Sequence, residues 1–284
     1  AKHRLPGRIY WYEQPENPTQ GEWPAHQICE RLSGIHSIAL GDVDGDGAQD
    51  LLATSALKSA DNAPTQFPES LLWYRFPDDP RKARLWEPIA FADQDAPGMT
   101  HYLGVGDINQ DGRLDAAVGA KVGEFPDGNY FAWWESPEDP TMPWIKHLVP
   151  NQHEGATHIS PYDIDQDGLM DFVASRGHGQ GVFWLKGPDW VEQPIHPEIS
   201  CPHALLLRDL DGDGDRDVAT CAFGSQEAWW YENNGRGVFR KHLVAAGQQG
   251  YDIRAHDVDL DGDFDLVIAG GDSNNAVWCE NPAR

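Results

Sequence analysis

The chain has 284 residues, and its 46 acidic and 21 basic residues give a formal net charge of −25 at pH 7. Nucleic acids and anionic membrane surfaces are bound through clustered Lys and Arg side chains, so this charge argues against both as partners. Apolar runs are too short for a membrane-spanning helix, and no signal peptide is visible. Abundant Gly, Pro and Trp, with almost no helical periodicity, predict an all-β protein of short strands and tight turns.

An acidic motif recurs five times along the chain. Its copies are DVDGDGAQD from Asp42, DINQDGRLD from Asp107, DIDQDGLMD from Asp163, DLDGDGDRD from Asp209 and DVDLDGDFD from Asp257. Short apolar runs flank the copies, as SIAL and LLATS do around the first. Self-similarity of this kind is typical of stacked or circular repeat architectures.

Each repeat also contains an aromatic strand, followed by a more polar strand. The aromatic strands carry six aligned residues, Trp11, Trp73, Trp133, Trp184, Trp230 and Trp278. With the two apolar runs, this predicts four strands per repeat. A single four-stranded sheet cannot bury both faces, so the copies are expected to stack in a ring, which is a β-propeller. The tryptophans would then fill the spaces between blades.

The number of blades is ambiguous in the sequence, because the acidic motif occurs five times whereas there are six aligned tryptophans. We expect one propeller domain over 1–284 with five blades, and six or seven blades as alternatives. Residues 1–32 would supply strands that pair with the last repeat and close the ring. The repeats would span about 33–97, 98–154, 155–200, 201–248 and 249–284.

The acidic motif, D-x-D-x-D-G-x-x-D, places side-chain oxygens at loop positions 1, 3, 5 and 9, with Gly at the bend. Hard oxygen ligands in an irregular loop suit calcium, which accepts six to eight oxygens at variable angles. The expected ligands are Asp42, Asp44, Asp46, Asp50, Asp107, Asn109, Asp111, Asp115, Asp163, Asp165, Asp167, Asp171, Asp209, Asp211, Asp213, Asp217, Asp257, Asp259, Asp261 and Asp265. We expect several structural Ca²⁺ ions.

The motif resembles the loops of FG-GAP or VCBS-type propeller repeats over essentially the whole chain. This resemblance implies that each loop joins the innermost strand to the second strand, on the bottom face, and binds calcium. The innermost strands would then begin at the top face, around the central channel.

Histidine recurs just before the acidic motif. His36, His101 and His203 each precede the first Asp by six residues, His158 precedes it by five, and the fifth repeat has Tyr251. Inner strands line the propeller axis, so the four imidazoles are expected to meet at the channel mouth. Clustered neutral imidazoles suit a transition metal such as Zn²⁺ or Mn²⁺. Hydrogen bonding to a substrate and simple packing are the alternatives.

Another set of histidines tests whether recurrence alone indicates function. His26, His147 and His242 lie on the outer strands, far from the axis, and we assign them no function. Loops from second to third strands should open on the same face as the inner histidines. They carry Lys58, Lys121, Arg176, His178 and Asp272, with Tyr102, Asp252 and Arg254 nearby.

Cations and a tyrosine around a metal could lower the pKa of a sugar's α-proton and supply a base, which is the equipment for β-elimination. The candidate catalytic residues are His36, His101, His158, His203, Tyr251, Lys121, Arg176 and His178. The arrangement resembles aldos-2-ulose dehydratase and propeller-type polysaccharide lyases, in which metal or histidine at the channel mouth assists proton abstraction. This resemblance implies a carbon–oxygen lyase acting on a carbohydrate, such as a uronic acid or keto-sugar.

Two other functions remain open at this stage, a sugar-binding lectin and a protein-interaction propeller. The loops expected at the top differ in length and sequence, which favours one asymmetric site over equivalent sites in every blade. The even number of cysteines and the calcium motifs favour a secreted or periplasmic protein. Cys29 with Cys279, or Cys201 with Cys221, could form disulfides, although free buried thiols are equally consistent with the sequence.

Overall fold

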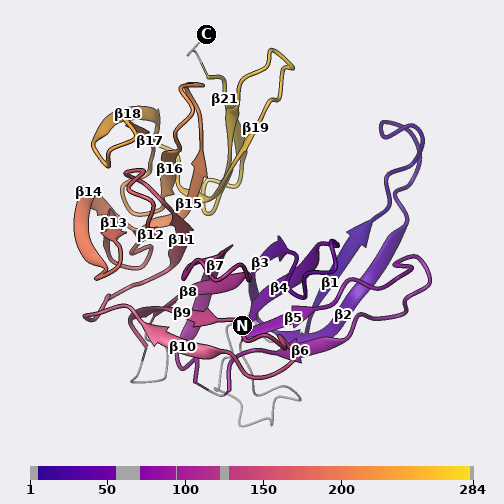
Figure 1. Cartoon of the computed structure of the whole chain (residues 1–284). Coiled ribbons are helices and arrows are strands. Elements are labelled where there is room, and N and C mark those ends of the chain that lie inside the picture. Colours follow the sequence, from indigo (N-terminus) through magenta and orange to yellow (C-terminus); the bar gives the residue numbers. More distant parts are fainter. Residues whose placement is uncertain (1–5, 56–70, 94, 122–127, 282–284) are drawn as a thin grey trace.

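The computed structural model describes residues 6–55, 71–93, 95–121 and 128–281, and every regular element in them is a β-strand (Figure 1). Four sheets have four strands each, paired antiparallel in chain order. They are β3 (Ile35–Gly41), β4 (Asp50–Ser55), β5 (Leu71–Tyr74) and β6 (Pro88–Ala90); β7 (Met99–Gly106), β8 (Asp115–Lys121), β9 (Tyr130–Glu135) and β10 (Ile145–Leu148); β11 (His158–Tyr162), β12 (Asp171–Ser175), β13 (Gln180–Lys186) and β14 (Val191–Ser200); β15 (Pro202–Arg208), β16 (Asp217–Ala222), β17 (Glu227–Asn233) and β18 (Phe239–Ala246).

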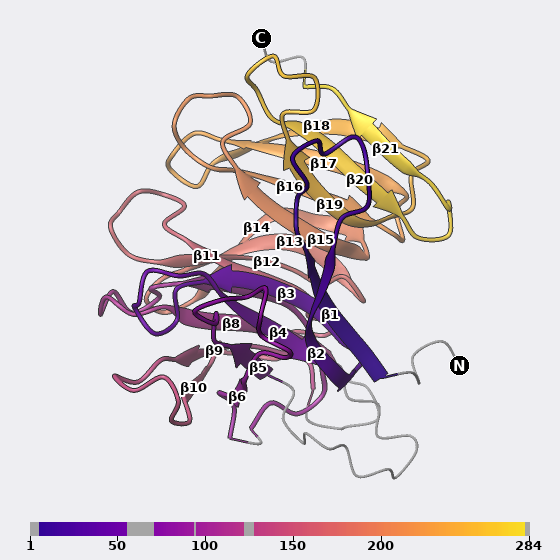
Figure 2. The same ribbon diagram turned by 90° about the vertical axis from the view of Figure 1, so that its right-hand side faces the viewer.

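A fifth sheet has three strands, β19 (Gly250–His256), β20 (Asp265–Gly270) and β21 (Ala276–Cys279). The five sheets from β3 to β21 are called blades 1 to 5 in chain order. They follow one another as the blades of a β-propeller (Figure 2), which confirms the predicted fold class. No helix among the described residues is long and apolar enough to cross a membrane.

The blades are joined through the aromatic residues of their third strands, as predicted. Trp133 of blade 2 packs in one apolar cluster with Phe172 and Phe183 of blade 3. Trp73 of blade 1 is fully buried in a cluster with Trp134 of blade 2. The cores therefore lie between neighbouring sheets.

The acidic motifs connect the first strand of each blade to the second. The last Asp of each motif begins the second strand, as Asp50 begins β4 and Asp217 begins β16. The second strand therefore leaves the loop at a buried carboxylate in every blade.

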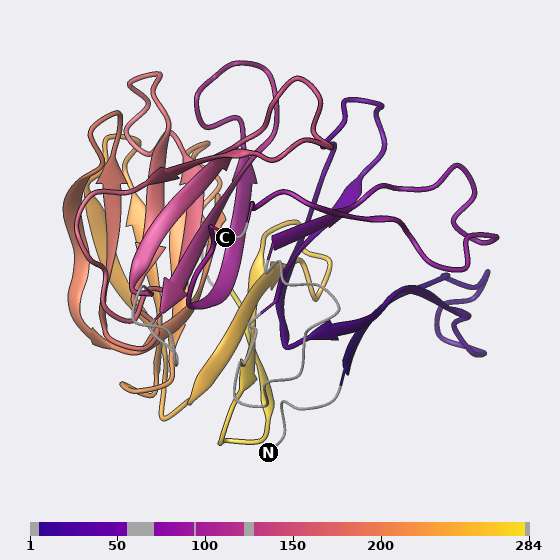
Figure 3. The ribbon, with the colours of Figure 1, turned by 90° about the horizontal axis from the view of Figure 1, so that it is seen from below.

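The N-terminal strands differ from the expectation. β1 (Pro6–Tyr12) and β2 (Ala25–Ser33) pair with each other in a separate two-stranded sheet, and do not extend the ladder of β19–β21. Trp11 lies opposite His26 and stacks on it with ring centroids 4.1 Å apart, as Trp133 does on His147 in blade 2. These strands therefore have the pairing of third and fourth strands, and share a core with blade 1 (Figure 3).

The four cysteines are all free thiols, so neither suggested disulfide is present. Cys29 belongs to the core between β2 and blade 1, whereas Cys279 packs in the cluster of blades 4 and 5. Cys29 and Cys279 are thus in separate apolar cores.

Candidate functional site

A β-bulge begins the inner strand in four of the five blades. The register shifts fall between Ile35 and Ser37, Thr100 and Leu103, Pro202 and Ala204, and Gly250 and Asp252. The residues at the bulges are therefore His36, His203 and Tyr251, and the pair His101 and Tyr102, which together oppose the single residue Gly119. A bulge changes the direction of a side chain relative to the regular pleat. Here it occurs at the residues that the sequence placed at the channel mouth.

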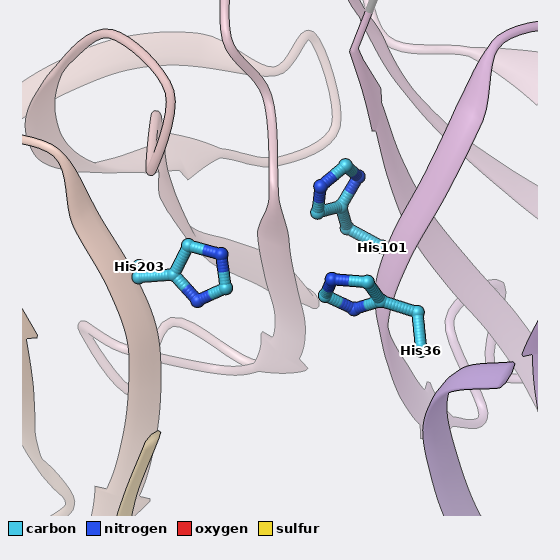
Figure 4. Close-up of side chains that lie close together, drawn as sticks. All are labelled: His36, His101 and His203. Atoms are coloured by element: carbon cyan, nitrogen blue, oxygen red, sulfur yellow. The ribbon is translucent and has the colours of Figure 1, made fainter. Parts of the chain in front are cut away.

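Three histidines meet at this position. His36 from β3, His101 from β7 and His203 from β15 each offer a ring nitrogen, and these nitrogens all lie within 4.8 Å of one another. Figure 4 shows the three rings projecting from separate strands into a common space. The ring centroids of His36 and His101 are 4.3 Å apart, and those of His36 and His203 are 5.9 Å apart.

Backbone carbonyls fix the tautomers of two of these rings. His101 donates its Nδ1–H to the Met99 carbonyl oxygen at 2.7 Å, and His203 donates its Nδ1–H to the Tyr251 carbonyl at 3.0 Å. In each ring the Nε2 atom is then left with a lone pair. Nε2 of His203 is buried and has no hydrogen-bond partner. Metal-binding histidines commonly have their second nitrogen held by a carbonyl in this way.

His178 is a fourth member of the cluster. Its Nε2 atom lies 3.1 Å from Nε2 of His101. The short loop between β12 and β13 places it there, since Gly177 donates its N–H to Thr157 and a Cβ at Gly177 would lie 2.8 Å from the Cα of His203. The sequence placed His178 in a loop on the same face and among the candidate catalytic residues, but not with the histidines of the inner strands.

Burial keeps these imidazoles neutral. It lowers the pKa of His101 to about 2, and the pKa values of His178 and His203 to about 4. The positive charge of Lys121, which lies opposite Met99 at the start of β7, lowers all three pKa values further. Near pH 7 the rings therefore present lone pairs, the form in which imidazole binds a metal.

His158 does not point into this cluster. Its Nδ1 accepts the N–H of Leu205 at 3.2 Å, its Nε2 bonds Ser160, and its ring stacks on Tyr102. Both ring nitrogens are thus used within the fold. The reason is local: β11 pairs with β12 without a register shift, so His158 follows the regular pleat. Its spacing of five residues from the acidic motif, one less than in the other blades, is the corresponding sequence signal.

Replacing His158 should change the acid sensitivity of the fold. Burial lowers its pKa to about 3, against about 6.5 in an unfolded chain. Because the folded state binds the proton more weakly, this histidine costs about 1.4 kcal/mol of stability per pH unit as pH falls below 6.5. We expect His158→Gln to be less stable than wild type at pH 7.5, with a deficit that shrinks by roughly 2 kcal/mol at pH 5. Denaturant unfolding of both proteins at both pH values measures this, and parallel pH profiles would contradict it.

The other predicted site residues are divided between the axis and the surface. Tyr251 packs against His203 with ring centroids 3.9 Å apart and planes tilted by 31°, and it is 43% exposed, so it borders the cluster. Arg176 instead forms hydrogen bonds from both Nη atoms to Glu192 on β14, directed away from the axis. Asp252 pairs with Arg254, Asp272 is exposed, and Lys58 lies outside the described residues.

The acidic loops bring carboxylates together as predicted. Three aspartates lie within 4.8 Å of one another in four of the loops; these are Asp42, Asp44 and Asp50; Asp163, Asp165 and Asp171; Asp209, Asp211 and Asp217; and Asp257, Asp259 and Asp265. Buried carboxylate oxygens without a hydrogen-bond partner, such as Oδ1 of Asp42 and of Asp165, suit a calcium ion. In the second loop Asn109 occupies the third position, and its Oδ1 accepts the N–H of Asp111.

The last aspartate of each motif has a second role that its predicted calcium ligation did not include. Asp115 is fully buried, and its two oxygens accept the N–H groups of Ile108 and Ser136, both at 2.9 Å. The same pair of backbone bonds is made by Asp50, Asp171, Asp217 and Asp265. These carboxylates fasten the acidic loop to the chain segment after the third strand.

The fold and its acidic loops can be compared with known protein families. The model of the FG-GAP-like repeat matches residues 107–174 and 209–278. The chain therefore contains FG-GAP-like repeats over these residues, as its motifs indicated. No curated protein sequence matches it.

Solved structures share its architecture. A chain in the crystal structure of a nidogen/laminin complex is 10% identical, with a TM-score of 0.62 over 99% of this chain and 89% of that one. A lectin of Agrocybe aegerita, described as recognising non-reducing terminal N-acetylglucosamine, is 16% identical, with a TM-score of 0.54 over 100% of this chain and 75% of that one. At such identities the likeness shows the fold alone.

Proposed function

We propose that this propeller is a secreted or periplasmic carbohydrate-active protein that works at the axial histidine cluster, as a carbon–oxygen lyase acting by β-elimination. The observation that carries the proposal is the convergence of three imidazoles from three blades, those of His36, His101 and His203. Lys121 and the exposed ring of Tyr251 border them. A cation, neutral bases and a hydroxyl group are thus close together.

The cluster has the donor atoms that a transition metal prefers. Nitrogens bound tetrahedrally to one zinc ion at about 2.0–2.1 Å lie about 3.3 Å apart. The ring nitrogens of His36, His101 and His203 lie within 4.8 Å of one another, a range that includes this spacing. His36, His101 and His203 would hold the ion, with His178 beside it. The metal would supply Lewis-acid polarisation of a sugar carbonyl or carboxylate.

The remaining residues account for proton transfer. The Lys121 ammonium attracts a substrate carboxylate, and the negative charge raises the pKa of the neighbouring imidazole. His178 then accepts the α-proton at a ring nitrogen, the C–H electrons form the new double bond, and the β carbon–oxygen bond breaks. The Tyr251 hydroxyl donates a proton to the departing oxygen. The products are an unsaturated sugar and a free hydroxyl compound.

Sugar binding without turnover is the second candidate. An exposed aromatic ring such as that of Tyr251 beside a cation can hold the apolar face of a sugar without chemistry. The shared fold with a lectin makes this alternative specific enough to test. The calcium ions proposed for the acidic loops would be structural in either case.

The test compares two histidines that both recur in the repeats. We expect His101→Ala to lose the transition metal and to abolish the gain in ultraviolet absorbance from a uronic-acid or keto-sugar substrate. His147→Ala, on the outer strand β10, should change neither, because its ring stacks on Trp133 and bonds Glu135. Metal analysis of the purified proteins and absorbance assays measure both effects.

Three outcomes are distinguishable. The lectin would be favoured if His101→Ala lost the metal while the wild-type protein bound sugar without any gain in ultraviolet absorbance. Identical metal content in both variants would refute the axial metal. If neither the wild-type protein nor either variant bound sugar, the result would favour a protein-interaction propeller.

A further inference from the structure

One position in the repeats changes sign from blade to blade. Two residues after the third-strand tryptophan, the side chain in blades 1 to 4 contacts the acidic loop or the outer strand of the same blade. It is basic in blades 1 and 3, and acidic elsewhere; the residues are Arg75, Glu135, Lys186, Glu232 and Glu280. The basic members form ion pairs with aspartates of their own blade's loop.

Lys186 occupies the acidic loop of blade 3. Its Nζ atom pairs with Asp165 and lies 2.7 Å from Oδ2 of Asp167. The ammonium group therefore sits among carboxylates at the third and fifth loop positions, where a calcium ion would bind them. Arg75 is similarly placed in blade 1, with its Nε 2.7 Å from Oδ2 of Asp44.

The loop of blade 4 is organised differently. Like the loop of blade 5, it has five aspartates in nine residues, because Asp215 adds a carboxylate to the four of the motif. Among the described residues, no Lys or Arg forms an ion pair with these five. Asp215 is only 7% exposed, and its Oδ1 is buried without a hydrogen-bond partner. Glu232 bonds His242 at 2.6 Å and brings no positive charge to the loop.

We infer that the loops bind calcium unequally: Lys186 and Arg75 act as built-in cations that compete with the ion in blades 3 and 1, whereas blade 4 requires a bound cation. A divalent ion entering blade 3 must displace an ammonium group from two carboxylates, which opposes binding. The same ion entering blade 4 relieves repulsion among five unbalanced carboxylates.

This difference connects calcium to the axial cluster. The blade 4 loop begins directly after β15, and His203 lies at the other end of that strand. An ion that fixes the loop therefore stabilises the strand that carries one of the three clustered histidines. His36 and His101 belong to blades 1 and 2. The loop of blade 1 pairs with Arg75 through Asp44, and the loop of blade 2 contains the Arg113–Asp111 ion pair. Calcium would therefore act on the proposed site mainly through His203. This link between calcium and the axial cluster rests on the proposed function.

The experiment measures calcium binding and needs no substrate. Metal-free protein is dialysed against increasing free calcium, and bound calcium per chain is determined. Wild type should show separate classes of tight and weak sites. Lys186→Gln should convert one weak site into a tight one, with affinity higher by about tenfold or more. Glu232→Lys should remove one tight site, and Lys241→Gln, an exposed lysine on β18, should match wild type.

Further readouts guard against misfolding. The calcium-induced rise in melting temperature should increase in Lys186→Gln, although this variant should be less stable than wild type in chelator. If Glu232→Lys does not fold, Glu232→Gln, which retains a partner for His242, should show an intermediate loss of affinity. Five equivalent sites in wild type, or an unchanged binding curve in Lys186→Gln, would overturn the inference. These outcomes are independent of any lyase or sugar-binding activity.

Discussion

Replacing Asp115 by Ala should destabilise the propeller by roughly 3 kcal/mol or more, even when calcium is absent. The carboxylate is fully buried and accepts the N–H groups of Ile108 and Ser136. Neither donor can reach water after the substitution, and each unsatisfied buried donor costs about 1–3 kcal/mol. Unfolding by denaturant in excess chelator measures this effect without any contribution from metal binding.

The matched control is Asp111→Ala in the same loop. Asp111 is exposed, and its side chain pairs with Arg113. Surface ion pairs contribute about 0–1 kcal/mol, so its loss should cost less than about 1 kcal/mol in chelator. With saturating calcium the two variants should become more alike, because both remove an expected ligand. Equal losses in chelator would show that Asp115 has no role apart from the metal.

The fold was predictable because it depends on features that repeat. Each acidic motif supplies both the turn and the buried carboxylate that starts the second strand, and each aromatic strand supplies the contact to the next blade. Because the same pattern of strands and turns occurs in five copies, an ambiguous strand assignment in one copy can be resolved from the others. The separate β1–β2 sheet was not predicted, because sequence pattern identifies strand type but not which exposed edge a strand will join.

The axial cluster was predictable in part. His36, His101 and His203 share one spacing from the acidic motif, and the structure brings them together. His158 was wrongly grouped with them, because a difference of one residue decides whether a bulge is present and therefore where the side chain points. His178 reaches the cluster through a loop whose path depends on contacts between neighbouring strands, which single-sequence patterns do not contain.

Arg176 shows the same limit for charged residues. Its position after a second strand suggested the channel mouth, but Glu192 on β14, the outermost strand of the same blade, binds its guanidinium group. A partner sixteen residues away on another strand becomes visible only once the sheet register is known. By contrast, Lys121 lies opposite Met99 on β7, two residues before His101, and its charge lowers the pKa of that ring.

The interfaces between blades are expected to make the largest single-residue contributions to stability. Trp73 and Trp278 occupy the same position in blades 1 and 5, so they provide a matched pair. Trp73 is 0% exposed, packs against blade 2 and donates its indole N–H to the Pro140 carbonyl at 3.2 Å. Trp278 is 49% exposed, because no following blade covers it in the described part of the chain.

Trp73→Ala should therefore reduce the free energy of unfolding by about 3–5 kcal/mol, because it removes a buried aromatic side chain and leaves a cavity between two sheets. Trp278→Ala removes a side chain that is half in water already, and should cost about 1 kcal/mol or less. Thermal and denaturant unfolding in saturating calcium compare the two variants without interference from the acidic loops. A large loss in Trp278→Ala would mean that another surface covers blade 5 in solution, whereas a small loss in Trp73→Ala would contradict the packing of blade 1 on blade 2.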